Sequence, residues 1–107
     1  MKFIFEVKLN AGKTAEEYAA AWVAASEIIQ RAPGARGTQL HRKIGDPATL
    51  MAIATWKSKE ARDTRDLFLK IDGALRATLD AHLSIVEFKL IGEYEEPEWV
   101  VNPPAGS

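Results

Sequence analysis

The stretch from Ala32 to Ala61 constrains the fold of this chain more than any other part. Its Pro33-Gly34 pair predicts the end of a helix, and Gly45-Asp46-Pro47 predicts a tight turn between two extended runs. The second run ends at Trp56, and Ser58 then predicts the N-cap of a new helix. The order is therefore helix, strand, turn, strand and helix, in the middle of a longer succession.

Strands are predicted at both ends of that succession. The first, within residues 1–10, has one apolar face made of Phe3, Phe5, Val7 and Leu9. The last runs from about Ser84 to Tyr94. Between the first strand and Ala32, Thr14 and Glu17 predict a capping box that opens an amphipathic helix. A further helix after Ser58 is predicted to break at Asp72-Gly73.

The two middle strands predict how the elements assemble. The second strand, from about Gly37 to Ile44, places His41 on its more polar side, whereas the third, Leu50 to Trp56, is apolar on both faces. The order βαββαβ predicts an antiparallel sheet with both helices on one face. The uncovered face would then expose an apolar patch of roughly a few hundred Å², which monomers rarely tolerate. We therefore expect a two-fold homodimer with its sheets packed face to face.

Length and composition exclude several classes. The 107 residues predict one domain, residues 1–95, followed by an irregular tail, residues 96–107. In the tail, Trp99-Val100-Val101 either reaches a partner subunit as a dimer arm or folds onto its own subunit. The absence of cysteine excludes disulfides and thiolate chemistry, and a net charge of -1 argues against nucleic acid and membrane partners. No signal peptide or membrane span is recognised, so we expect a cytoplasmic protein.

The element order also resembles that of a known family. The residues that carry the resemblance are Pro33-Gly34, Gly37, Leu40-His41-Arg42, Asp46-Pro47, and Trp56 followed by Ser58-Lys59-Glu60-Ala61. Together they resemble the antibiotic biosynthesis monooxygenase family of the dimeric α+β barrel superfamily. The resemblance implies an α+β, ferredoxin-like βαββαβ fold that forms a dimeric α+β barrel, with a ligand pocket between the helices and the sheet of each subunit. It also implies a cofactor-independent oxygenase acting on quinols or polycyclic phenols, with no cofactor.

Two subgroups of that family differ in their site residues. The haem-degrading subgroup has an Asn, a Trp and a His where this chain has Val7, Arg65 and Leu75, so none of the three matches. The phenol-oxidising members resemble this chain at Trp56 and Arg76. An Asn and a Tyr of those members are replaced near Ala52 and Arg62.

Four residues are candidates for catalysis. Trp56 either forms a pocket wall, with its indole N–H free for a substrate oxygen, or packs in the hydrophobic core. His41 either takes a proton from the substrate or is an exposed or interface histidine without a chemical role. His82 is a base, or it stabilises the end of a helix through the helix dipole. Arg76 holds an anionic substrate oxygen, or it forms salt bridges with Asp72 or Asp80 on the helix surface.

Tyr18, Trp22 and Phe68 are the candidate substrate-binding residues, with plain core packing as the alternative. Two distant histidines without acidic partners at helical spacing give no metal motif. We therefore predict a homodimeric monooxygenase for a small apolar or aromatic, quinol-like or polyketide-like molecule. A non-catalytic ligand-binding or accessory protein is the alternative, and isomerase or lyase chemistry on the same scaffold stays open.

Overall fold

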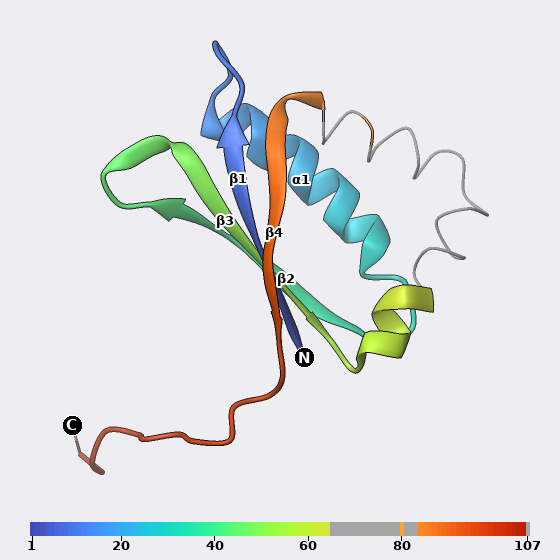
Figure 1. Ribbon diagram of the computed structural model, residues 1–107, viewed down its shortest axis with the longest axis vertical. Helices are drawn as coiled ribbons and strands as arrows, with labels where there is room; N and C mark the ends of the chain where they lie inside the picture. Colours follow the sequence, from blue (N-terminus) through green and yellow to red (C-terminus); the bar gives the residue numbers. More distant parts are fainter. Residues whose placement is uncertain (65–79, 81–83, 107) are drawn as a thin grey trace.

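The computed structural model describes residues 1–64, 80 and 84–106 of the chain. Its elements are β1 (Lys2–Leu9), α1 (Ala15–Ile29), β2 (Ala35–Lys43), β3 (Asp46–Trp56) and β4 (Val86–Tyr94), as Figure 1 shows. A further helix begins after Ser58 and is described over residues 59–64. Within the described ranges, no helix is long and apolar enough to cross a membrane.

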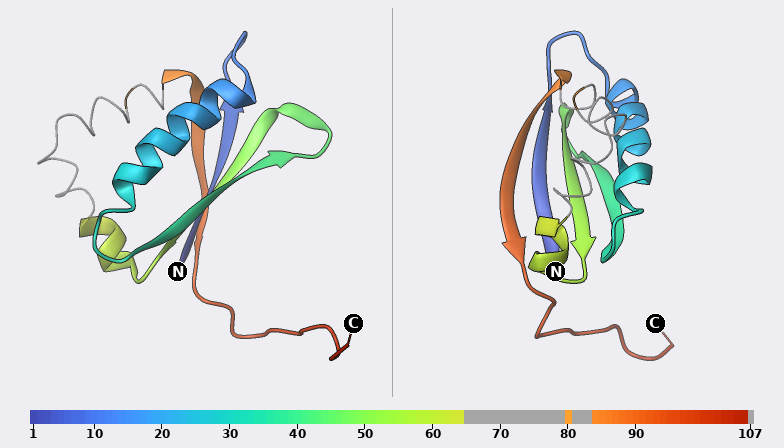
Figure 2. Two further views of the ribbon diagram at one scale, coloured as in Figure 1. Left: turned by 180° about the vertical axis from the view of Figure 1, so that it is seen from behind. Right: turned by 90° about the vertical axis from the view of Figure 1, so that its right-hand side faces the viewer.

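The strands form one antiparallel sheet in the order β2-β3-β1-β4. This order confirms the predicted ferredoxin-like α+β fold. Helix α1 lies against one face of the sheet only, which we call the inner face (Figure 2). The opposite face is called the outer face. Because side chains alternate along a strand, each pairing in the register assigns two side chains to the same face.

Helix α1 begins as its sequence predicts. The Thr14 hydroxyl accepts a hydrogen bond from the Glu17 backbone N–H at 3.2 Å and lies 3.4 Å from the Glu17 carboxylate. Glu16 and Glu17 also place negative charge in the first turn, where the helix dipole favours it. The cap fixes the start of the helix, so its buried side chains face the sheet. These are Ala15, Tyr18 and Ala25.

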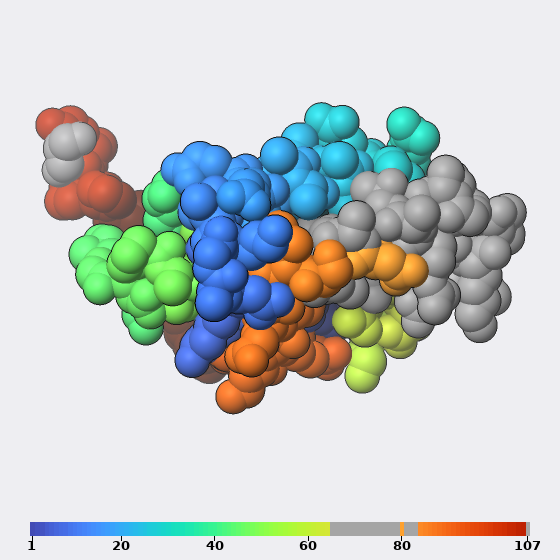
Figure 3. Space-filling model, turned by 90° about the horizontal axis from the view of Figure 1, so that it is seen from above, coloured from blue at the N-terminus to red at the C-terminus, as the bar shows by residue number. Residues whose placement is uncertain are grey.

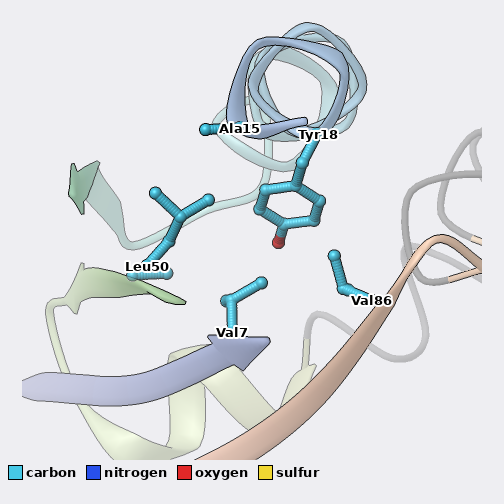
Figure 4. Packing of buried hydrophobic residues seen from close by; sticks show 6 residues of the cluster. Val7, Ala15, Tyr18, Leu50 and Val86 are labelled. Carbon is cyan, nitrogen blue, oxygen red and sulfur yellow. The ribbon is translucent and has the colours of Figure 1, made fainter. Parts of the chain in front are cut away.

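The core lies between α1 and the inner face. Val7 and Phe3 of β1 are fully buried there, and Tyr18 reaches down from α1. Figure 4 shows the Tyr18 ring entering the space between Leu50, Val7 and Val86. The predicted apolar face of the first strand is thus confirmed as the floor of the core.

The hairpin between β2 and β3 is tighter than the sequence predicts. Only Ile44 and Gly45 connect the strands, since Lys43 pairs with Asp46. The prediction that Asp46 and Pro47 form the turn was wrong, because β3 already begins at Asp46. Gly45 has φ +87°, a left-handed conformation that supports such a short turn. The carboxylate of Asp46 accepts hydrogen bonds from the Ala48 N–H at 3.0 Å and the Thr49 hydroxyl at 2.7 Å.

The outer face has an apolar centre and charged margins. Ile4 lies opposite Ile53, and Met51, which is 40% exposed, lies opposite Glu6 and His41. Toward β4, the outer-face pairs are Glu6 with Lys89 and Lys8 with Glu87. The predicted apolar outer side of the third strand is confirmed, but its neighbours on β1 and β4 bring alternating charges.

The tail after β4 leaves the body of the molecule. Figure 3 shows it projecting from the rest of the chain. Trp99 is 87% exposed and Val101 is 97% exposed, so these apolar side chains find no cover on their own subunit. The Cα radius of gyration is 15.5 Å, whereas a compact domain of this length has about 13 Å.

Gly34 is a point of close contact between α1, β2 and the next helix. It has φ +85°, and a Cβ at this position would lie 2.5 Å from the Ala61 Cβ. We expect Gly34→Ala to lower the free energy of unfolding by about 2 to 4 kcal/mol, because left-handed strain and a steric clash add. Chemical denaturation measures this loss.

Gly12→Ala is the matched control. Gly12 has φ +81° but no atom within 4 Å of the added Cβ, so only the strain of about 1 kcal/mol applies. Equal losses in the two variants would contradict the close contact at Gly34.

The hydrogen bonds of the Asp46 carboxylate predict a dependence of stability on pH. Hydrogen bonds from the Thr49 hydroxyl and the Ala48 N–H hold the pKa of the Asp46 carboxyl below its usual value. A lowered folded-state pKa gives stability that is present above the unfolded-state pKa and lost as the pH falls through the folded-state value. Between about pH 5 and pH 3, the native chain should therefore lose more stability than Asp46→Asn. Urea unfolding measures both, and equal losses in the two chains would contradict the role of the Asp46 carboxylate.

Candidate functional site

Aromatic side chains line the inner face where β1 meets β4. Phe5 and Phe88 stack with ring centroids 4.6 Å apart and an interplanar angle of 22°. Leu90 lies opposite Phe5 and is 44% exposed, so α1 does not cover this part of the inner face completely. Phe5, Phe88 and Leu90 together form an apolar surface, which suits an aromatic ligand.

Trp56 ends β3 on the same face. It is 2% exposed and shares a buried cluster with Phe3 and Ala32. Its backbone is fixed on both sides, since its N–H donates to the Met1 carbonyl at 2.9 Å and its carbonyl accepts from the Met1 amino group at 3.0 Å. The indole therefore has a fixed position at the end of the inner face.

Arg62 brings a positive charge to this aromatic cluster. Arg62 lies in the helix that follows Trp56. The Ser58 hydroxyl caps this helix by accepting a hydrogen bond from the Ala61 N–H at 3.1 Å. The guanidinium carbon of Arg62 lies 4.9 Å from the centroid of the Phe3 ring. Its Nε is buried and has no hydrogen-bond partner within the described parts of the chain. The predicted Ser58 cap is confirmed, and it determines where Arg62 lies.

Other charged side chains near the inner face form ion pairs. Glu93, opposite Phe3, lies 3.7 Å from Lys59. Arg42 contacts Glu16 at 2.6 Å, and the hydrogen bond from Arg42 lowers the pKa of the Glu16 carboxyl. Among the described residues, no three His, Asp or Glu side chains gather in a group that could hold a metal ion.

Tyr18 is the most deeply buried polar side chain of α1. It is fully inaccessible, and burial raises the pKa of its hydroxyl far above the usual value. A phenol with a raised pKa stays protonated at neutral pH, so Tyr18 does not act as a base there. Trp22, one turn further along, is half-buried and packs against the same cluster.

A match to a family model identifies the chain. The model described as antibiotic biosynthesis monooxygenase matches residues 2–66, which include β1, α1, β2, β3 and the start of the next helix. The chain belongs to the antibiotic biosynthesis monooxygenase family. The resemblance inferred from the sequence is thereby confirmed.

Solved structures of other proteins share the fold. SnoaB, a cofactor-independent oxygenase from Streptomyces nogalater, is 14% identical, with 92% of this chain and 96% of that chain covered and a TM-score of 0.68. A conserved protein from Methanosarcina mazei Go1 is 11% identical, with 83% and 87% covered and a TM-score of 0.63. No curated protein matches the chain.

The candidate residues predicted from the sequence fall into three groups in this family member. Trp56, Tyr18 and Trp22 all lie on the inner side of the sheet. His41 is exposed and pairs with Met51 on the outer face, so one subunit does not bring it to Trp56. Arg76, His82 and Phe68 lie outside the described residues.

Arg62 is the residue whose role the sequence did not reveal. The resemblance to the phenol-oxidising members marks Arg62 only as the replacement of a tyrosine, and nothing in the sequence links it to Phe3. Its position in the sequence did carry a signal. Ser58, two residues after Trp56, caps the helix, so residues in the first turn of that helix lie near the tryptophan. The capping pattern at Ser58 therefore could have placed it.

Proposed function

We propose that this protein is a cofactor-independent monooxygenase acting on a small, electron-rich aromatic, quinol-like or polyketide-like molecule. The observation that carries the proposal is the inner-face aromatic cluster with Trp56 at its end, in a chain that belongs to the antibiotic biosynthesis monooxygenase family. SnoaB, named as a cofactor-independent oxygenase, has the same fold. Flat aromatic walls suit a polycyclic substrate, since stacking adds to the burial of apolar surface.

In the proposed reaction, the substrate loses a proton to the solvent and the resulting carbanion gives one electron to O₂. The substrate radical and superoxide combine and take up a proton to form a hydroperoxide, and loss of water then leaves a carbonyl. A CH₂ group and O₂ thus become C=O and H₂O. The substrate supplies all the electrons, so no further reductant is needed. Trp56 donates its N–H to the substrate oxygen on which negative charge develops.

A non-catalytic ligand-binding protein is the second candidate. It is favoured by Ala52 and Arg62, which stand near the places of an Asn and a Tyr in the phenol-oxidising members that the sequence resembles. A chain that kept the aromatic surface and lost the catalytic groups would bind the same molecules without oxidising them.

We also propose that the protein is a homodimer whose outer faces pack together. Ile4, Met51 and Ile53 would form the apolar centre of that interface. The charges around a hollow of about 200 Å³ alternate between Glu6, Lys8, Glu87 and Lys89, so a two-fold copy can set unlike charges opposite one another. The exposed Trp99 and Val101 would be covered as an arm on the partner.

Oxygen uptake tests the proposed chemistry. With a panel of quinols and anthrones, we expect the native chain to consume O₂ and Trp56→Phe to lower kcat by about 10²-fold, because it removes one N–H donor from the developing negative charge. An oxygen electrode gives the rate, and product analysis gives the carbonyl.

Trp99→Phe, in the exposed tail, is the matched control and should keep the native rate. His41→Ala decides between the two faces of the sheet: loss of uptake there would contradict a site on the inner face. Binding of the same molecules without uptake would favour the second candidate.

Sedimentation velocity at micromolar concentration tests the dimer. We expect the native chain to sediment as a dimer and Met51→Lys as single chains, because the substitution places a charge in the apolar centre of the outer face. Val23→Lys makes the same kind of change on the exposed surface of α1, where Val23 is 45% exposed, and should stay dimeric. Single chains in the native sample would contradict the proposal.

A further inference from the structure

Arg62 is held in a partly buried position that its packing alone does not require. Its side chain is 23% exposed, and its guanidinium carbon lies over the fully buried Phe3 ring. The Nε donor is inaccessible and has no hydrogen-bond partner in the described chain. Its other contact is weak: an Nη lies 3.6 Å from a carboxylate oxygen of Asp63, which is 55% exposed.

An unsatisfied donor on a charged group is costly. Native proteins pair nearly all buried polar groups, so each exception calls for an explanation. A buried N–H of a cation loses its hydration without a replacement, whereas a shorter or apolar side chain at this position would avoid that loss. The described structure offers the Nε an aromatic face on one side and no acceptor. The described residues thus leave room for an acceptor on a bound ligand.

The guanidinium is suited to one kind of acceptor. The guanidinium is a planar set of donors that matches two oxygens, or one oxygen carrying negative charge. The side chain is 23% exposed, so a ligand can approach it from the solvent side. The Phe3 ring lies against the guanidinium and supports it before a ligand binds. The Phe3 ring under the guanidinium belongs to a buried apolar cluster with Ala32 and Trp56, and such surroundings strengthen the attraction between opposite charges.

We propose that Arg62 binds an anionic oxygen of the ligand, so the ligand is an aromatic anion, that is, a carboxylate, phenolate or enolate on a flat ring system. The inference rests on the proposed aromatic site and adds the charge of its occupant. In an oxidation, the same contact favours the deprotonated substrate over the neutral one. Arg62 then replaces, by electrostatics, part of what a general base would do.

The test uses a pair of probes of the same shape, 2-naphthoate and its neutral amide 2-naphthamide, in isothermal titration calorimetry with the full chain. We expect native protein to bind the anion about 10- to 100-fold more tightly than the amide. Arg62→Gln should bring this ratio close to one by weakening only the anion, and Arg62→Lys should give an intermediate ratio. Arg31→Gln, an exposed arginine after α1, should leave the ratio unchanged.

The outcomes separate the two proposals. Equal binding of both probes by the native chain would overturn the role of Arg62 and leave the aromatic site standing. A native preference for the anion that survives in Arg62→Gln would also overturn the role of Arg62. Binding of neither probe would overturn the aromatic site and the inference together.

Stability without ligand gives a second measurement that does not depend on the probes. We expect Arg62→Met to raise Tm by a few degrees, because it removes the unsatisfied donor and keeps an apolar contact with Phe3. A lower Tm, or failure of Arg62→Gln to fold, would mean that the guanidinium supports the structure, and would overturn the proposal.

Discussion

The inner face depends on the pairing of large side chains on β1 with small ones on β3. Phe3 lies opposite Ala54 and Phe5 lies opposite Ala52, in a strand pair whose hydrogen bonds fix the register. Bulky residues on both strands would compete for the same space, since directly opposed side chains are close neighbours. The alanines leave room above the phenylalanine rings. The packing of α1, of Phe88 and of Arg62 therefore depends on this register.

Much of the fold follows from local patterns. The alternation from Phe3 to Leu9 predicts a strand and its buried face, and Thr14 predicts the start of α1; the structure confirms both. The hairpin shows the limit of such reasoning. Asp46 and Pro47 are turn formers in isolation, but pairing of Lys43 with Asp46 draws them into β3. Tertiary pairing thus overrides turn preference when a short left-handed glycine link is available.

The candidate site was less predictable, because its contacts join distant parts of the chain. The alternation of side chains along β2 correctly places His41 and Leu40 on opposite faces of the sheet. It does not say which face a helix covers, and the structure shows that α1 covers the face of Leu40. The contact between Arg62 and Phe3 spans most of the described chain, and neither residue is unusual for its own element. An unsatisfied Nε is a property of the assembled surroundings and has no sequence signature.

These contacts give Phe3 two roles that oppose each other energetically. As a buried ring on β1 it stabilises the core, and as the support of a guanidinium it holds a charge where water is scarce. Tyr18 keeps its proton because burial disfavours the charged form of its phenol and so raises its pKa. The apolar surroundings that keep the Tyr18 phenol neutral would also keep a bound phenolic ligand protonated. A fixed cation would favour the deprotonated form of the ligand without affecting Tyr18. The position of Arg62, more than a general base, would then decide whether the ligand becomes reactive toward oxygen.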